Sequence, residues 1–299
     1  MNSIPAFPEF IKVDFNLLNE VETALEAFPP TVSSITLGNI FCYRNETDLK
    51  ATRVFGNIVF LGFYKGIHFF TQPLGNNRIE ETFFACLKYL KETTGGGRLN
   101  NIPGEMAEPL RKDGRLFIFP DRSSFDYVYS TAELADLPGE KFHDKKNLVN
   151  QFNKRHIHEY RSLDKGLISQ CLDLEEEWCK LRNCLEDIST AAENTCIYEL
   201  LTHFDELKLF GGAIIVDGKI QAFTILQKMN ADTAVTHIEK ANTEFKGIYQ
   251  AINNYAAIKE LKAYAFVNRE EDLGHAGLRK AKLSYNPVRL EEKYHIELA

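Results

Sequence analysis

The sequence predicts an α/β protein with mixed sheets, divided into two domains. Three observations point to this fold class. The chain has 299 residues, 44% hydrophobic and 12% aromatic, which is enough for one large or two ordinary cores. Helical and strand-like apolar periodicities alternate along the chain. The order of these elements in the second half is loosely repeated in the first, which favours two domains of one architecture.

The second half has the clearer pattern. Two apolar runs separated by Asp217-Gly218 predict a β-hairpin. A third strand follows at 233–239, and its alternation puts Val235, His237 and Glu239 on one face. The other expected elements are helices at 168–183, 194–207, 248–261 and 273–285 and strands at 263–267 and 289–298.

The first half contains matching signals. Tight turns are expected at Gly56-Asn57 and Lys65-Gly66. Helices are expected at 17–27, 78–91 and 105–111, and strands at 116–120 and 126–130. We expect an N-terminal domain of residues 1–150 and a C-terminal domain of residues 151–299, with the charged segment 131–154 as the bridge.

Composition excludes several classes of function. The net charge of -7 is spread evenly, so extended nucleic-acid binding through a basic stripe is disfavoured. The first residues do not resemble a secretory signal, and no run has the length of a membrane span, so we expect a cytoplasmic protein. The cysteines form no CxxC pair, and His156 and His158 have no third ligand near them in sequence. No metal site is therefore expected.

The most informative motif is NREEDLGHAGLRKAKLSYNP, residues 268–287. It follows an apolar run that reads as a buried strand, so its polar groups would lie at the edge of a sheet where ligands bind in open α/β folds. His275, Arg279 and Lys282 share one flank of the following helix, at spacings of four and three. A solvated helix face fits the same spacing.

Three stretches carry a family resemblance: FDYVYSTAELADLPGEKFHDKKNLVNQF at 125–152, HIEKAN at 237–242 with the following KGIYQAIN, and the motif ending in SYNP. With the element order, they resemble the C-terminal domain of phosphatidylglycerol lysyltransferases, including stand-alone bacterial members of unassigned function. The resemblance implies two tandem acyl-CoA N-acyltransferase-like (GNAT-like) domains. It also implies transfer of an acyl or aminoacyl group to an amine or hydroxyl.

In the lysyltransferases the donor is an aminoacyl-tRNA and the acceptor is a lipid hydroxyl. This chain lacks the membrane-spanning region of the full-length enzymes, so a soluble amine, a peptide or a protein terminus fits equally well as acceptor. Pyrophosphate-binding relatives carry a Gln/Arg-x-x-Gly-x-Gly/Ala loop, but in residues 244–249 only Gly247 matches it. This departure from the loop pattern disfavours coenzyme A and favours either an aminoacyl-type donor, such as an aminoacyl-tRNA in transient contact, or a degenerate site. No bound cofactor is identified.

The expected site lies in the second domain. Its candidate catalytic residues are Glu239, His237 and Asn268, with Glu239 or His237 as general base. The candidates for binding donor or substrate are Arg269, Arg279, Lys282, Gly247 and Lys146. Structural salt bridges would explain the same charges. The competing functions are a binding module that captures an anionic metabolite or peptide without chemistry, and a carrier that uses an interdomain groove.

Overall fold

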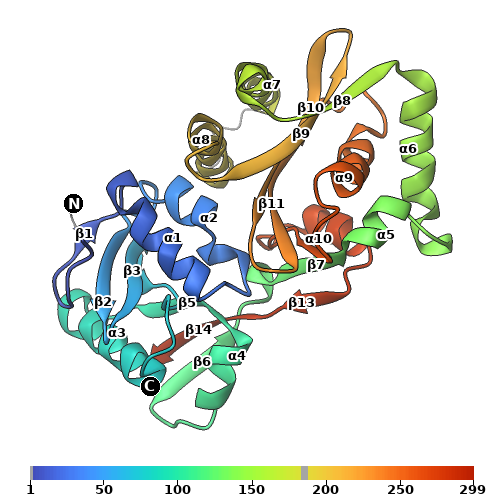
Figure 1. Cartoon of the computed structure of the whole chain (residues 1–299). Coiled ribbons are helices and arrows are strands. Elements are labelled where there is room, and N and C mark those ends of the chain that lie inside the picture. The colour runs from blue at the N-terminus through green and yellow to red at the C-terminus, as the bar shows by residue number, and fades with distance from the viewer. Residues whose placement is uncertain (1–2, 183–187) are drawn as a thin grey trace. The chain divides into compact units, whose positions relative to one another are not determined.

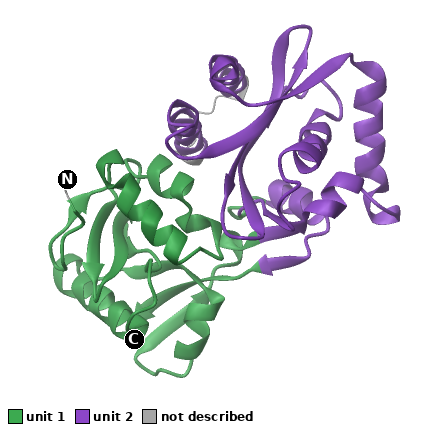
Figure 2. Ribbon diagram, viewed as in Figure 1, with its two compact units in different colours: residues 1–126, 271–275, 291–299 green, residues 127–270, 276–290 purple. Residues whose placement is uncertain are grey.

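The computed structural model describes residues 3–182 and 188–299, which form two compact units (Figures 1 and 2). Unit 1 runs to Asp126 and includes residues 271–275 and 291–299, whereas unit 2 comprises residues 127–270 and 276–290. This division differs from the expected boundary at residue 150. The reason is an exchange of strands, because a strand from the first half joins the second sheet and the last strand of the chain joins the first.

Unit 1 is built on a mixed sheet. Within the described residues, this sheet has seven strands in the order β1-β2-β3-β4-β5-β14-β6. Its strands are β1 (Ile11–Lys12), β2 (Lys50–Val54), β3 (Asn57–Tyr64), β4 (Ile67–Phe70), β5 (Arg98–Pro103), β6 (Leu116–Pro120) and β14 (Lys293–Leu298). Its helices are α1 (Leu18–Ala27), α2 (Leu37–Cys42), α3 (Ile79–Thr94) and α4 (Gly104–Ala107).

Helix α3 shows how the sequence builds this unit. Phe83, Cys86, Leu87 and Leu90 recur at helical spacing and are all at most 2% exposed, packed in one cluster with Phe70 and other residues of the sheet. The helix ends at Gly95 in the left-handed conformation, φ 77°. The turn predicted at Lys65-Gly66 also forms and connects β3 to β4. The turn between β2 and β3 is formed by Phe55 and Gly56, one residue earlier than the predicted Gly56-Asn57, because Asn57 already pairs with Val54.

Unit 2 has a second mixed sheet. Within the described residues, its seven strands follow the order β13-β7-β12-β11-β10-β9-β8. They are β7 (Asp126–Ser130), β8 (His158–Ser162), β9 (Leu209–Val216), β10 (Lys219–Lys228), β11 (Thr233–Ala241), β12 (Phe266–Asn268) and β13 (Arg289–Glu291). Its helices are α5 (Thr131–Asp136), α6 (His143–Arg155), α7 (Lys165–Arg182), α8 (Ile188–Thr202), α9 (Ile248–Lys259) and α10 (Ala276–Leu283).

Helices cover both faces of this second sheet (Figure 1). Helices α7 and α8 lie on one face, and α9 lies on the other with α5 and α6 packed against it. Ala251 and Ile252 of α9 contact Ile214 of β9 and Ala222 of β10 in one buried cluster. The β9–β10 hairpin turns at Asp217 and Gly218 with φ angles of 51° and 77°, as their sequence predicts for a type I′ turn.

Two predictions about the chain's path were wrong. The expected strand at 289–298 is two strands, β13 and β14, which belong to different sheets. The expected bridge at 131–154 forms α5 and α6 and belongs to unit 2. The helix expected at 273–285 forms, over the shorter span Ala276–Leu283. Among the described residues, we find no helix with both the length and the apolar character needed to span a bilayer.

Candidate functional site

The candidate site lies where two parallel strands of unit 2 part. Strands β11 and β12 pair over only three residues, ending with Val235 opposite Asn268. Strand β11 continues to Ala241 and remains paired with β10 on its other side. The segment of β11 beyond Val235 therefore has an edge that β12 does not cover. Polar groups placed there can approach a ligand, as at other points where parallel strands end.

Arg269 and Glu239 form an ion pair across this opening. Glu239 lies on the uncovered part of β11, and Arg269 directly follows β12. The Arg269 side chain is only 13% exposed and that of Glu239 only 11%. Arg269 donates from Nη2 to one carboxylate oxygen, and Asn253 of α9 donates to the other at 2.9 Å. Because a buried charge is costly unless it is paired and hydrogen-bonded, these contacts hold Glu239 in one position.

Two tyrosine rings surround the Arg269 guanidinium. Its Cζ lies 5.6 Å from the ring centre of Tyr129 and 4.9 Å from that of Tyr285. Burial raises the pKa of Tyr285 to about 12, although the Arg269 charge opposes this shift. Burial also acts to lower the pKa of Arg269, but the charge of Glu239 outweighs it and the pKa is raised. Arg269 is therefore a cation flanked by neutral phenols.

One donor of this cation is unused. The Nη1 atom of Arg269 is buried and has no hydrogen-bond partner among residues 3–182 and 188–299. A buried donor without a partner costs about 1–3 kcal/mol. A ligand that supplied an acceptor would remove this cost.

Two lysines lie beside Arg269. Lys282 of α10 donates to the backbone carbonyl of Arg269. Lys145 of α6 donates to Ser284 Oγ at 2.7 Å, and its Nζ lies 4.5 Å from the Tyr285 ring centre. Burial lowers the pKa of Lys145, and the nearby Arg269 charge lowers it further. Lys146, the predicted binding residue, is exposed, so the phase of α6 brings its neighbour to the site instead.

His237 does not join Glu239, and the prediction that they share a face was wrong. Thr236 and Ile238 pair with the adjacent residues Leu226 and Ile225 of β10, so His237 is an extra residue in a β-bulge. The bulge interrupts the alternation. Glu239 reaches α9, whereas His237 contacts Gln227, whose amide donates to the Leu207 carbonyl that follows α8. The imidazole is 1% exposed and its other nitrogen lies 2.9 Å from Glu270.

Two further candidates have structural explanations. Asn268 is fully buried and its Oδ1 accepts a hydrogen bond from the Glu270 backbone, so it shapes the end of β12. Gly247 precedes α9 with φ 92°, and a Cβ there would lie 2.3 Å from the Leu148 carbonyl oxygen. Helix α6 packs so closely at this point that only glycine fits. Arg279 is half-buried on α10. The structure thus brings together Glu239, Arg269 and Lys282.

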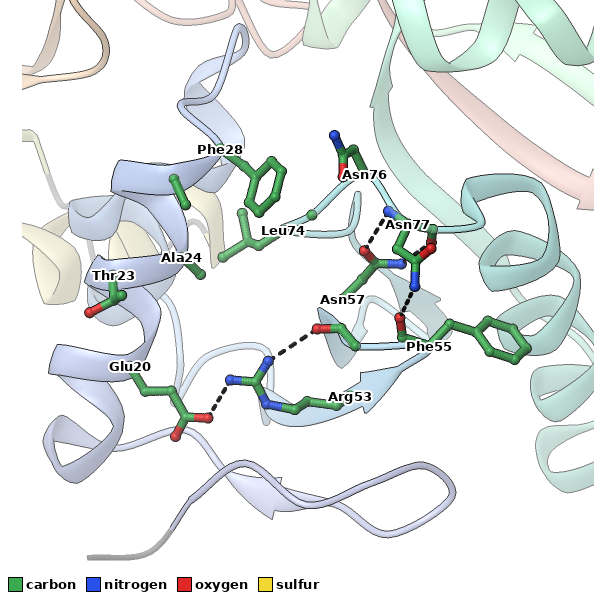
Figure 3. A pocket seen from close by; sticks show the side chains of 13 residues that line it. Glu20, Thr23, Ala24, Phe28, Arg53, Phe55, Asn57, Leu74, Asn76 and Asn77 are labelled. Carbon is green, nitrogen blue, oxygen red and sulfur yellow. Dashed lines mark hydrogen bonds and ion pairs between the residues drawn. The ribbon is translucent and has the colours of Figure 1, made fainter.

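A separate pocket of about 450 Å³ lies in unit 1 between α1, the β2–β3 turn and residues 74–77 (Figure 3). Its charged groups satisfy one another, since Arg53 donates to Glu20 at 2.6 Å and to the Gly56 carbonyl at 3.1 Å. Asn57 bonds both the backbone N–H and the carbonyl of Asn77, which fixes the loop. None of the predicted site residues lines this pocket.

Comparison with known proteins identifies the family. The model of the family described as "Phosphatidylglycerol lysyltransferase, C-terminal" matches residues 26–297, almost the whole chain. The chain belongs to this family. The resemblance found in the sequence motifs is thereby confirmed.

Solved structures show the same fold. A conserved protein of unknown function from Bacteroides thetaiotaomicron is 31% identical, with a TM-score of 0.89 over 97% of this chain and 99% of its own. L-PGS from Bacillus licheniformis is 14% identical, with a TM-score of 0.65 over 93% and 91%. FemX is 11% identical, with a TM-score of 0.61 over 97% of both chains. The predicted tandem acyltransferase-like fold is confirmed.

A curated relative provides a shorter match. It is an uncharacterised protein of Mycoplasmoides gallisepticum, 25% identical over 182 residues, which cover 59% of this chain. The match spans 57% of that relative's length.

Sequence reasoning missed one residue that contacts the ion pair directly. Asn253 donates to Glu239 from within α9. The signal was present, since Asn253 and Asn254 interrupt the apolar stripe of this helix and are both buried. A buried amide needs a hydrogen-bond partner, so polar residues on the inner face of a helix indicate a polar group opposite.

Proposed function

We propose that this member of the lysyltransferase C-terminal family transfers an aminoacyl or acyl group to an amine or hydroxyl acceptor at the open end of β11 and β12. The observation that carries the proposal is the buried Arg269–Glu239 pair across the opening, with one Arg269 donor unused. An ion pair that only stabilised the fold would not need to leave a buried guanidinium nitrogen without an acceptor.

The uncovered edge of β11 suits an extended donor. Beyond Val235 it offers backbone groups to which an acyl or aminoacyl chain can bind like an added strand. Arg269 and Lys145 supply positive charge for an anionic part of the donor. Positioning of this kind, together with N–H groups near the developing oxyanion, supplies much of the rate in acyl transfer.

The proposed reaction forms one bond and breaks one. The acceptor nitrogen or oxygen bonds to the acyl carbon, and the bond from that carbon to the donor's leaving atom breaks with its electron pair. The acceptor loses a proton and the leaving atom gains one. Glu239 is the candidate base, because each of its carboxylate oxygens has one donor and keeps a further lone pair.

We further propose an aminoacyl ester on tRNA as the donor. The family description names lysyl transfer. The start of α9 supports the choice against coenzyme A, because α6 approaches Gly247 closely and Tyr249 follows where a pyrophosphate loop needs a small residue. A soluble amine, a hydroxyl compound or a peptide is the proposed acceptor.

The test follows loss of the donor's acyl bond. Purified protein is incubated with a pool of tRNAs charged with labelled amino acids, and separately with acetyl-coenzyme A, each with a mixture of amines, alcohols and peptides. We expect discharge of tRNA well above spontaneous hydrolysis. Arg269→Met should reduce it ~100-fold, the usual effect of removing one positioned donor. Arg161→Met, an exposed arginine on β8, is the matched control and should retain the rate.

The outcomes separate the alternatives. If only acetyl-coenzyme A is consumed, the proposal of aminoacyl-tRNA as the donor is refuted, whereas the proposal of group transfer is supported. If neither donor is consumed and a small anion stabilises the protein thermally only when Arg269 is present, the protein is a binding module and not a transferase.

A further inference from the structure

A cluster of charges is buried on the face of the second sheet opposite the candidate site. Lys240 of β11 is 4% exposed, and its Nζ lies 2.8 Å from Glu193 of α8 and 3.8 Å from Glu175 of α7. The same Nζ lies 3.5 Å from the ring centre of Trp178, also on α7. Lys240 therefore ties both helices to the strand. The indole face attracts this desolvated ammonium through a cation–π interaction.

The charges of this cluster do not balance. Two carboxylates face one ammonium, and they differ in their surroundings. Glu193 is 43% exposed, so water solvates its charge. Glu175 is 0% exposed, and neither of its oxygens has a hydrogen-bond partner among the described residues. Glu175 is thus the group for which ionisation is costly, since an unsolvated carboxylate without donors is strongly disfavoured.

The charged groups of neighbouring elements do not balance the two carboxylates that face the one ammonium. Strand β10, which packs against α7, carries charge only at its exposed ends, Lys219 and Lys228. His237 is on the same face but is hydrogen-bonded to Glu270 and Gln227. Burial raises the pKa of Glu175 to about 7, with Lys240 lowering it and Glu193 raising it further. The burial of Glu175 and its lack of hydrogen-bond donors among the described residues explain why its pKa is raised.

We propose that Glu175, Lys240 and Glu193 form a proton-binding site that controls how tightly α7 and α8 are held on β11. With a proton on Glu175, one carboxylate matches one ammonium and the helices pack closely. Above neutral pH the buried site carries an excess negative charge, and the helix pair loosens. This device is independent of the transfer proposed above, because its groups lie on the opposite face from Arg269 and Glu239.

Trp178 reports on the site directly, since it is the chain's single tryptophan. We expect acrylamide quenching of its fluorescence to rise between pH 6 and 8, with a midpoint near 7. Glu175→Gln carries no titrating carboxyl and should give constant, low quenching over this range. Glu177→Gln is the matched control, because it removes an exposed carboxylate from the same helix and should behave as the wild type.

Urea unfolding gives a second measure. The raised pKa of Glu175 stabilises the fold fully below pH 4.5, and this contribution is lost as the pH rises to about 7. Relative to Glu175→Gln, the unfolding constant of the wild type should rise up to ~10-fold per pH unit within that window. The proposal is overturned if wild-type quenching is flat, if Glu175→Gln keeps the transition, or if Glu177→Gln removes it.

Discussion

Replacing Arg269 by methionine tests whether the pair with Glu239 is a buried interaction. With both side chains about nine-tenths buried, removal of one partner leaves a buried charge uncompensated, for which losses of about 3–5 kcal/mol are usual. Some solvent reaches both groups, so we expect a loss of about 3 kcal/mol in the free energy of unfolding. An exposed pair would lose only about 0.2–1 kcal/mol.

A double-mutant cycle in urea isolates the pairwise contribution. The variants are Arg269→Met, Glu239→Met and the double variant, each compared with the wild type. Because the double variant leaves no unpaired charge, it should be less destabilised than the sum of the single variants by ~2 kcal/mol. Single losses under ~1 kcal/mol, or losses that simply add, would refute the description of Arg269 and Glu239 as a buried, coupled pair.

Three further predictions concern the framework. Gly247→Ala should destabilise the protein by ~2 kcal/mol or more, because its Cβ would meet the Leu148 carbonyl. Gly139→Ala, also at positive φ but with open space around it, should lose only ~1 kcal/mol. Equal losses in urea unfolding would contradict the close packing of α6 at Gly247. Burial, and secondly the charge of Arg98, lower the pKa of His295 below 6.5. The neutral imidazole therefore contributes stability above pH 6.5, and this contribution is lost as the pH falls through the lowered pKa. An NMR titration of His295 with a midpoint at or above 6.5 would be inconsistent with this prediction. Asn253→Asp should destabilise by ~2 kcal/mol at pH 8, where two carboxylates meet, and by less at pH 4; an effect independent of pH would argue against the contact with Glu239.

Much of the fold could be predicted from local sequence. The apolar stripe of α3, the spacing of Ala251, Ile252 and Ala256 in α9, and the Asp217-Gly218 turn each encode a structure in adjacent residues. These signals depend on which side chains are buried and on local backbone preferences, which short segments retain in any fold. The tandem architecture followed from their order.

The candidate site was predicted in part. Glu239, Arg269 and Lys282 were named from their places at strand and helix ends, and the structure brings these three together. The contact between Glu239 and Arg269 spans 30 positions of sequence and depends on where β11 and β12 part, which no local pattern encodes. The choice of Lys145 over Lys146 similarly depends on the rotation of α6 against α9.

The sequence by itself determined most of the helices, the Asp217-Gly218 and Lys65-Gly66 hairpins, the tandem order and the stretch of chain that holds the candidate site. Only the tertiary structure decided that the last strand joins the first sheet, that a bulge turns His237 away from Glu239, and that two carboxylates share Lys240 on the opposite face. Periodicity reports whether a residue is buried, because burial follows the local geometry of a helix or strand. It does not report which distant group is opposite, because strand register and helix rotation are set by the packing of the whole unit.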